Sequence, residues 1–483
     1  MDRPVVISNR AAWGLEARAL LKLAVPLVAT QIAQMVILAT DTAMLGHFSK
    51  DALAAAALGN TIFFMAWLMG CGLPMAVSPV IAHILGETEA SARENLPRRG
   101  DSTLPDAANF PVRPRDHRKV RAAVRMGLWS VALTLPFFAV LLFFTRDLLL
   151  FVGEDPKLAA GAARYMSSLA WCLPFALAFQ VLRSFSTALS RAVPPLIVMA
   201  LAVLFNALGD YALIFGHFGL PRLGLFGAGI ASASSNFFTF VAMLAFCLLA
   251  PKLRNYHILH RLTRPDWKTL AELLRLGVPM GVTMLFEVAM FNGATLAMGA
   301  FGTASIAAHQ IAITIPSLTF MVPLGIGLAA TVRVGMAAGA GDAKAARRAG
   351  FAAIAMAMSF MSATALLLLL YPRVIASLWL PDTPDNAEVL ALAVTFLHVA
   401  SAFQLMDGVQ VTAAMSLRGL KDARLPMWLA GASYWLAGAP MCALLGFGLG
   451  LKGLGIWLGL AFGLLVASIL LSARFFILSR RHT

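Results

Sequence analysis

The stretch TMLFEVAMFNGATLAMGAFG, residues 283–302, is apolar almost throughout and carries one carboxylate, Glu287, near its middle. Twenty residues of α-helix span about 30 Å, which matches the hydrocarbon core of a bilayer. A charge at that depth costs roughly 2.5–3.5 kcal/mol and is usually retained because it has a function. The stretch therefore predicts a transmembrane helix with a functional acid inside it.

Similar apolar runs recur from end to end of the 483-residue chain. Hydrophobic residues make up 60% of the sequence and charged residues 13%, and the mean hydropathy is +0.80. A soluble domain carries about 25% charged residues. We therefore expect an all-α membrane protein with twelve transmembrane helices. The expected spans are 20–45, 53–85, 122–145, 158–190, 194–216, 224–250, 271–299, 305–338, 348–371, 387–417, 425–447 and 453–478.

The net charge of +15 is distributed unevenly along the chain. Most Lys and Arg residues lie in the N-terminal tail, in every second loop and at the C-terminal Arg480 and Arg481, whereas the alternate loops carry few. Basic loops stay on the cytoplasmic side of a membrane. We therefore predict a multi-pass protein of the plasma (inner) membrane with both termini in the cytoplasm. This distribution also argues against nucleic acid as a partner.

The chain repeats itself at a shift of 253 residues, which aligns Pro26 with Pro279 and Gly72 with Gly325. Near the ends of the repeats, LGLFGAGI at 223–230 matches LGLKGLGI at 449–456. Six spans per half make the two halves parallel repeats. We predict an N-terminal lobe at 1–250 and a C-terminal lobe at 251–483, with substrate bound between them and alternating access by rocking of one lobe against the other.

The shift between the repeats falls by about 30 residues after Gly86, which locates an insertion at about 87–116 in the first half. This segment is polar, rich in proline and without apolar periodicity, so it predicts a disordered cytoplasmic loop. A regulatory or lipid-binding role and a tolerated loop insertion both remain open for it.

Four acids lie within apolar segments: Asp41, Asp210, Glu287 and Asp407. Their positions along the spans predict one pair in each lobe, with Asn206 one helical turn before Asp210 and on the same face. Intramembrane acids mark ion and substrate pathways. The alternative for any one of them is a hydrogen bond to a neighbouring helix.

Other polar residues within the spans are weaker signals, because such side chains often only join helices. We take four of them as possible accessory site residues: Gln34, Gln180, Asn292 and Gln404. The sequence contains neither a GxxxxGK[ST] phosphate loop nor His and Cys at metal-binding spacing, so we expect neither an enzyme nor a bound cofactor.

Several stretches resemble the multidrug and toxic compound extrusion (MATE) family over almost the whole chain except the insertion. They are ATDTAMLGHFSKDALAAAALG at 39–59, LFEVAMF at 285–291, IAAHQIAITIPSLTFMVPLGIGLAATVRVGMAAG at 306–339 and FQLMDGVQVTAAMSLRGLKDARLPM at 403–427. A Glu in the seventh span with an Asp in the tenth resembles the NorM-type branch. The resemblance implies a two-lobe antiporter that exports cationic amphiphilic compounds in exchange for H⁺ or Na⁺.

The resemblance also implies roles for the acids. Glu287 and Asp407 match the cation-coupling site of the second lobe, where Na⁺ is a possible ligand, and Asp41, Asn206 and Asp210 match the polar site of the first lobe. NorM-type proteins often have a tyrosine one turn before the span-ten Asp, where this chain has a phenylalanine, residue 403. The missing hydroxyl favours H⁺ over Na⁺, because a proton needs only a carboxylate.

The expected partners are small cationic organic compounds and the lipid bilayer, and we expect a monomer. An exporter of a lipid-linked or other metabolite, similar to a flippase, is the alternative. The acidic character of the intramembrane charges favours cations over a lipid-linked pyrophosphate. The sequence leaves open the physiological substrate, the choice between Na⁺ and H⁺ and the oligomeric state.

Overall fold

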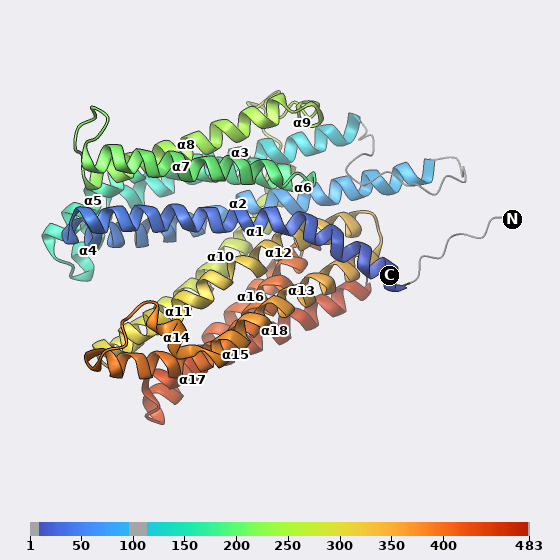
Figure 1. Ribbon diagram of the computed structural model, residues 1–483. Coiled ribbons are helices and arrows are strands. Elements are labelled where there is room, and N and C mark those ends of the chain that lie inside the picture. Colours follow the sequence, from blue (N-terminus) through green and yellow to red (C-terminus); the bar gives the residue numbers. More distant parts are fainter. Residues whose placement is uncertain (1–8, 96–113, 482–483) are drawn as a thin grey trace. The chain divides into compact units, whose positions relative to one another are not determined.

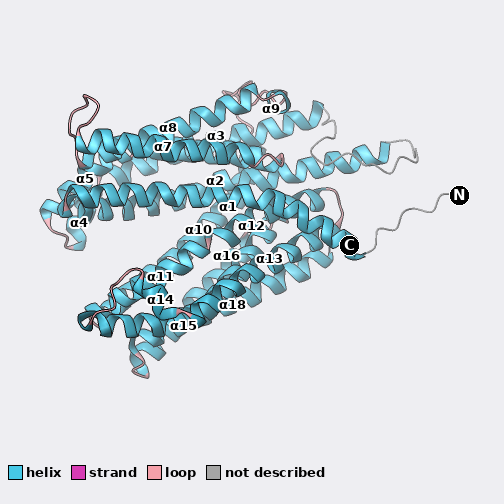
Figure 2. Cartoon of the chain, viewed as in Figure 1, coloured by secondary structure: helices cyan, strands magenta, loops and turns pink. Residues whose placement is uncertain are grey.

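The computed structural model describes residues 9–95 and 114–481 (Figure 1). Within these ranges the regular elements are helices and no strand occurs (Figure 2). The first half of the chain contains α1 (Asn9–Phe48), α2 (Lys50–Asn95), α3 (Pro114–Phe143), α4 (Thr145–Val152), α5 (Pro156–Leu169), α6 (Cys172–Ala188), α7 (Val193–Phe215), α8 (Leu225–Leu249) and α9 (Pro251–Arg254). The second half contains α10 (Trp267–Gly299), α11 (Thr303–Thr319), α12 (Met321–Gly339), α13 (Ala343–Leu370), α14 (Pro372–Ser377), η2 (Pro384–Asn386), α15 (Ala387–Gly419), α16 (Arg424–Ala432), η3 (Ser433–Gly438), α17 (Ala439–Ala443), η4 (Leu444–Gly448) and α18 (Lys452–Arg481).

Each expected span falls on a helix or on consecutive helices, which confirms the all-α, multi-pass architecture. Ten helical segments of the described chain are long and apolar enough to cross a membrane, and the pair α5 and α6, bent by 44°, adds an eleventh. The span expected at 122–145 lies on α3 but is not among them. By length and composition the described residues therefore provide ten or eleven spans.

The chain divides into two compact units, which we call the N-unit and the C-unit. The N-unit is residues 29–281, and the C-unit is residues 282–483 together with the chain up to Val28. Both boundaries lie inside a helix, α1 or α10, two residues after Pro26 and Pro279. These prolines are equivalent in the repeat, so the boundaries follow it. They differ from the expected division at residue 250, because α1 and α10 each contribute to both units.

The insertion expected to be disordered at 87–116 is helical at both of its ends. Helix α2 continues through Asn95, and α3 begins at Pro114. An ion pair of 3.1 Å between Lys119 Nζ and Glu87 Oε2 joins the two helices. The prediction of a loop was therefore wrong for residues 87–95 and 114–116, where the polar sequence extends the helices. Residues 96–113 lie outside the described part of the chain.

In the N-unit, the turn between α7 and α8 depends on glycine. Gly216 ends α7 with a φ of 80°, in the left-handed region that favours glycine, and Gly224 before α8 has a φ of 57°. The turn allows α7 and α8 to pack on each other along their lengths. Through this pairing the polar residues of α7 and α8 become neighbours.

In the C-unit, α15 is the central helix. It packs against α11, α12, α13 and α18, and more than half of its residues are buried. The segment that follows α16 is irregular, with π-helical turns at η3 and η4. Asp407 on α15 therefore lies inside the packed helices of this unit.

The contact between α2 and the first part of α10 leaves no room for a side chain. A Cβ on Gly277 would lie 2.7 Å from Leu73 Cα and 2.9 Å from Gly72 O. We expect Gly277→Ala to destabilise the protein by about 1–3 kcal/mol, because the backbones must move apart. Gly293→Ala in the same helix is the control, because a Cβ there meets no heavy atom within 4 Å. Thermal unfolding of the detergent-solubilised variants measures both, and equal midpoints would contradict the expectation.

Candidate functional site

The acids of the first half meet in the N-unit. Asp41 comes from α1, and Asn206 and Asp210 come from α7, where a spacing of four residues places both on one face. Asp41 is 6% exposed, and the other two side chains are fully buried. Asp41 Oδ2 accepts a 2.9 Å hydrogen bond from Ser232 Oγ on α8, and Asp41 interacts electrostatically with Asp210 and Asn206. The structure thus brings the three predicted residues together.

Much of this N-unit cluster has no hydrogen-bond partner among the described residues. Both carboxylate oxygens of Asp210, Asp41 Oδ1, and both polar side-chain atoms of Asn206 lack one, although the side chains lie within electrostatic range of each other. A buried polar group without a partner costs about 1–3 kcal/mol. An arrangement of carboxylate and amide oxygens in this state is suited to binding a cation or a proton.

Two further residues of the N-unit cluster were not found from the sequence. Ser232 lies 191 positions after Asp41 in the sequence and donates a hydrogen bond to its carboxylate. Tyr165 is fully buried on α5, donates a 3.2 Å hydrogen bond to Asn60 Oδ1 and interacts electrostatically with Asp41. A serine or tyrosine in an apolar helix carries no recognisable signal in a single sequence.

The accessory glutamines of the N-unit lie around a buried arginine rather than on the acids. Arg183 on α6 is 4% exposed and donates hydrogen bonds to the side chains of Gln31 and Gln34 on α1. Gln180 is also buried on α6, three residues before Arg183. Gln34 therefore serves as a hydrogen-bond acceptor for a guanidinium.

The acids of the second half meet in the C-unit. Asp407 on α15 is 5% exposed, and its Oδ1 has no hydrogen-bond partner among the described residues. Glu287 on α10 is partly exposed and interacts electrostatically with Asp407. The second predicted pair is thus also close in space, with one buried acid and one partly exposed acid.

Arg418 also belongs to this C-unit cluster, although nothing in the sequence singled it out. The side chain is 7% exposed, its Nη1 lies 3.3 Å from Met415 Sδ, and it interacts electrostatically with Glu287. With both carboxylates ionised, two negative charges and one guanidinium leave a net charge of −1. A single monovalent cation would neutralise this cluster.

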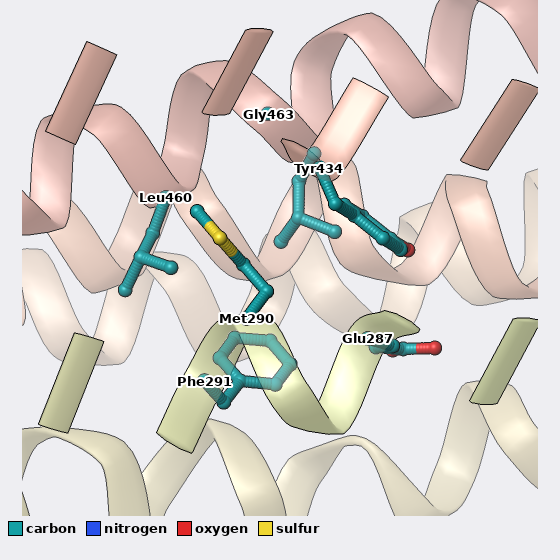
Figure 3. A pocket seen from close by; sticks show the side chains of 7 residues that line it. Glu287, Met290, Phe291, Tyr434, Leu460 and Gly463 are labelled. Atoms are coloured by element: carbon teal, nitrogen blue, oxygen red, sulfur yellow. The ribbon is translucent and has the colours of Figure 1, made fainter. Parts of the chain in front are cut away.

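A small cavity lies beside Glu287 within the C-unit (Figure 3). Its volume of about 10 Å³ is close to the minimum that holds one water molecule. The cavity is lined by Glu287, Met290, Phe291, Tyr434, Leu460, Gly463 and Leu464. The carboxylate of Glu287 and the hydroxyl of Tyr434 lie on the same side of it, away from Leu460 (Figure 3). Tyr434 is the second residue of this cluster that the sequence did not reveal.

The remaining accessory residues lie outside the C-unit cluster or serve its framework. Gln404 is fully buried, accepts a 3.1 Å hydrogen bond from Thr319 and donates to Met361 O, so it joins α15 to α11 and α13. Asn292 is exposed on α10. Among the residues that the structure describes, no three His, Cys, Asp or Glu side chains are arranged to hold a metal ion.

Comparison with known proteins finds the MatE family, whose profile matches residues 26–95, 115–212 and 279–444. The probable multidrug resistance protein NorM of Brucella suis biovar 1 (strain 1330) is 41% identical over 481 residues, which cover 99% of this chain and 96% of that protein. The protein of the same name in Pseudomonas aeruginosa is 38% identical over 462 residues, covering 95% and 89%.

Solved structures share the fold. A MATE transporter in complex with MaL6 superposes with a TM-score of 0.81 at 19% identity and covers 97% of each chain. The eukaryotic MATE transporter AtDTX14 gives 0.79 at 19% identity, covering 98% of this chain and 99% of the other.

Proposed function

Because this chain belongs to the MATE family of membrane transporters, we propose that it is an antiporter that exports cationic amphiphilic compounds in exchange for H⁺ or Na⁺. Its relatives at 37–41% identity are named multidrug resistance proteins, which supports small organic compounds as the cargo. It is a multi-pass membrane protein and a transporter rather than an enzyme.

The observation that carries the proposal is the pair of acidic clusters within membrane helices, one in each unit. A carboxylate inside a bilayer is costly unless a counter-charge is present. Either an inorganic cation or an organic cation can supply that charge, but both cannot occupy the same carboxylate. Competition for the carboxylates would therefore couple the inward movement of one cation to the outward movement of the other.

The cluster of Glu287, Asp407 and Arg418 suits such competition because its net charge is −1. One monovalent cation neutralises it, and the neutral cluster no longer attracts a second cation. In this scheme the partly exposed Glu287 would meet the organic cation, and the buried Asp407 would meet only a small ion. The N-unit cluster of Asp41, Asn206 and Asp210 would provide a second site for a cation or proton.

Orientation and assembly follow the sequence. We propose that both termini are cytoplasmic in the plasma membrane, because loops rich in Lys and Arg stay on the cytoplasmic side of a membrane, and that a monomer is the transporting unit. The phenylalanine at residue 403 favoured H⁺ because it lacks a phenol hydroxyl that could bind Na⁺. Tyr434 lines the cavity beside Glu287 and carries another phenol, so this argument no longer favours H⁺ over Na⁺.

Purified protein in liposomes tests the proposal with ethidium as a cationic dye. We expect an opposing gradient of Na⁺ or H⁺, each imposed alone, to drive ethidium movement several-fold faster than in protein-free liposomes. An anionic dye of similar size should not move. An ethidium transport rate that depends on neither the Na⁺ gradient nor the H⁺ gradient would contradict antiport. Movement of an anionic lipid-linked pyrophosphate instead of the dye would favour the flippase alternative, which the acidic clusters argue against.

A further inference from the structure

A group of arginines lies at the end of the N-unit where α3 begins, and the transport scheme does not use it. We call it the arginine cluster, and its members are Arg118, Arg121 and Arg125 of α3 and Arg261 and Arg264 of the connection between α9 and α10, residues 255–266. Spacings of three and four residues place the first three on one face of α3. Arg121 interacts electrostatically with Arg118, Arg125 and Arg261, so α3 and the connection bring their positive charges together.

The arginine cluster has no anionic partner within the described residues. None of its five side chains forms an ion pair there. Two acids of the neighbouring segments are engaged elsewhere, because Glu87 pairs with Lys119 and Asp266 Oδ1 accepts a hydrogen bond from the backbone N–H of Thr269. Arg125 Nε is buried and also lacks a hydrogen-bond partner. Like charges at close range repel each other, and an anion between them would remove that cost.

Three side chains of α3 fix the connection in place. Arg121 Nε donates a 2.8 Å hydrogen bond to Tyr256 O, and Arg125 Nη1 donates one of 3.2 Å to Arg261 O. Trp129 Nε1 donates a third, of 2.8 Å, to Leu262 O. Successive turns of α3 thus bind carbonyls along the connection. The cluster is formed before a ligand arrives, which lowers the entropic cost of binding.

The arginine cluster lies where two membrane helices end. Helix α8 ends at Leu249 and α10 begins at Trp267, and both are long and apolar enough to cross a membrane. In the connection, Leu259 and Leu262 are 39% and 38% exposed, and Trp267 is 65% exposed. Exposed tryptophan and leucine beside basic residues are typical of segments at the level of lipid headgroups. A soluble acidic partner would leave these apolar side chains in water, whereas a lipid surface covers them.

We propose that the arginine cluster binds the phosphate of an anionic phospholipid, whose acyl chains lie against Leu259, Leu262 and Trp267. A guanidinium binds phosphate oxygens through two parallel N–H···O hydrogen bonds. Basic pockets between membrane helices bind acidic headgroups in this way. Phosphatidylcholine carries a phosphate too, but its positive choline cancels the charge and is repelled by the cluster. The site therefore selects lipids by headgroup charge, and it does not depend on the proposed antiport.

The test is thermal unfolding of purified full-length protein in detergent micelles at increasing lipid concentration. Dioleoylphosphatidylglycerol and dioleoylphosphatidylcholine share their acyl chains and differ in headgroup charge. We expect the phosphatidylglycerol to raise the unfolding midpoint of the wild type in a saturable manner and the phosphatidylcholine to raise it less. The double variant Arg118→Gln/Arg261→Gln should need an about tenfold or more higher concentration of phosphatidylglycerol for half of the effect.

The matched control is Arg146→Gln/Lys157→Gln. It removes the same charge from exposed residues of the same unit, in α4 and α5, and should respond to phosphatidylglycerol as the wild type does. Arg118 and Arg261 are also exposed, and their side chains donate no hydrogen bond within the described residues, so their loss leaves the connection fixed to α3. The midpoints of all variants in phosphatidylcholine show whether folding is unchanged.

Three results would overturn the proposal. They are an equal effect of the two lipids on the wild type, a wild-type response of Arg118→Gln/Arg261→Gln, and an equal loss of response in the control, which would indicate attraction by net charge alone. Millimolar inorganic phosphate should leave the midpoint unchanged, and a saturable rise would assign the cluster to free phosphate instead. If the double variant unfolds earlier in phosphatidylcholine, Arg264→Gln decides: weaker phosphatidylglycerol binding supports the lipid site, and unchanged binding overturns it.

Discussion

An Asp407→Asn variant is expected to reach the membrane, to fold and to export a cationic dye about 100-fold more slowly than the wild type. The amide has nearly the volume of the carboxylate, so the packing of α15 against α11, α13 and α18 is kept. The charge that a coupling ion or an organic cation must neutralise is lost. Without Asp407 the remaining Glu287 and Arg418 carry no net charge to attract a cation, and we expect exchange to fall by about 100-fold, which corresponds to about 3 kcal/mol of cation-binding free energy. Ion-driven ethidium movement in liposomes measures the loss.

Glu287→Gln is expected to give the same loss, because the two acids act on one cation. Asp382→Asn is the control in the same unit. Asp382 is exposed and pairs at 3.0 Å with Arg373 on the surface, and exposed pairs contribute little to stability. The Arg373 guanidinium holds the pKa of Asp382 below its ordinary value, so the control also removes a charged carboxylate. A variant of either cluster acid with wild-type ethidium export would show that the residue is not a coupling site.

Asp41→Asn is expected to abolish transport while leaving the protein as stable as the wild type or more so. Asp41 and Asp210 are buried acids that interact electrostatically, and like charges at such sites repel each other. An amide relieves that repulsion and still accepts a hydrogen bond from Ser232. Removing a strained functional charge commonly raises stability and lowers activity.

Two measurements on Asp41→Asn separate a functional acid from a structural one. Thermal unfolding should give an unchanged or raised midpoint, whereas ion-driven ethidium export should fall by about 100-fold, as for the C-unit acids. Asp147→Asn, an exposed acid of α4 in the same unit, should leave both unchanged. A lowered midpoint with proportionate loss of export would indicate that Asp41 only holds α1 against α8.

The class of the protein and the identity of its acids could be predicted from the sequence. Hydropathy is a local property, and a helix in lipid must satisfy its backbone within the segment, so each apolar run of 20 residues predicts its own helix. A carboxylate in such a run is visible without any tertiary information. The positions of the acids along the spans predicted one pair in each lobe, and the structure brings Asp41 near Asp210 and Glu287 near Asp407.

Only the tertiary structure decided which other residues complete the clusters. Ser232, Tyr165, Arg418 and Tyr434 are separated from their acids along the chain, and helix packing alone brings them together. The unit boundaries inside α1 and α10 were hidden for a related reason. Hydropathy stays high on both sides of each boundary, so it cannot show where a continuous helix passes from one packed unit into the other. That depends on which side chains fit against each residue, which is a property of the folded chain.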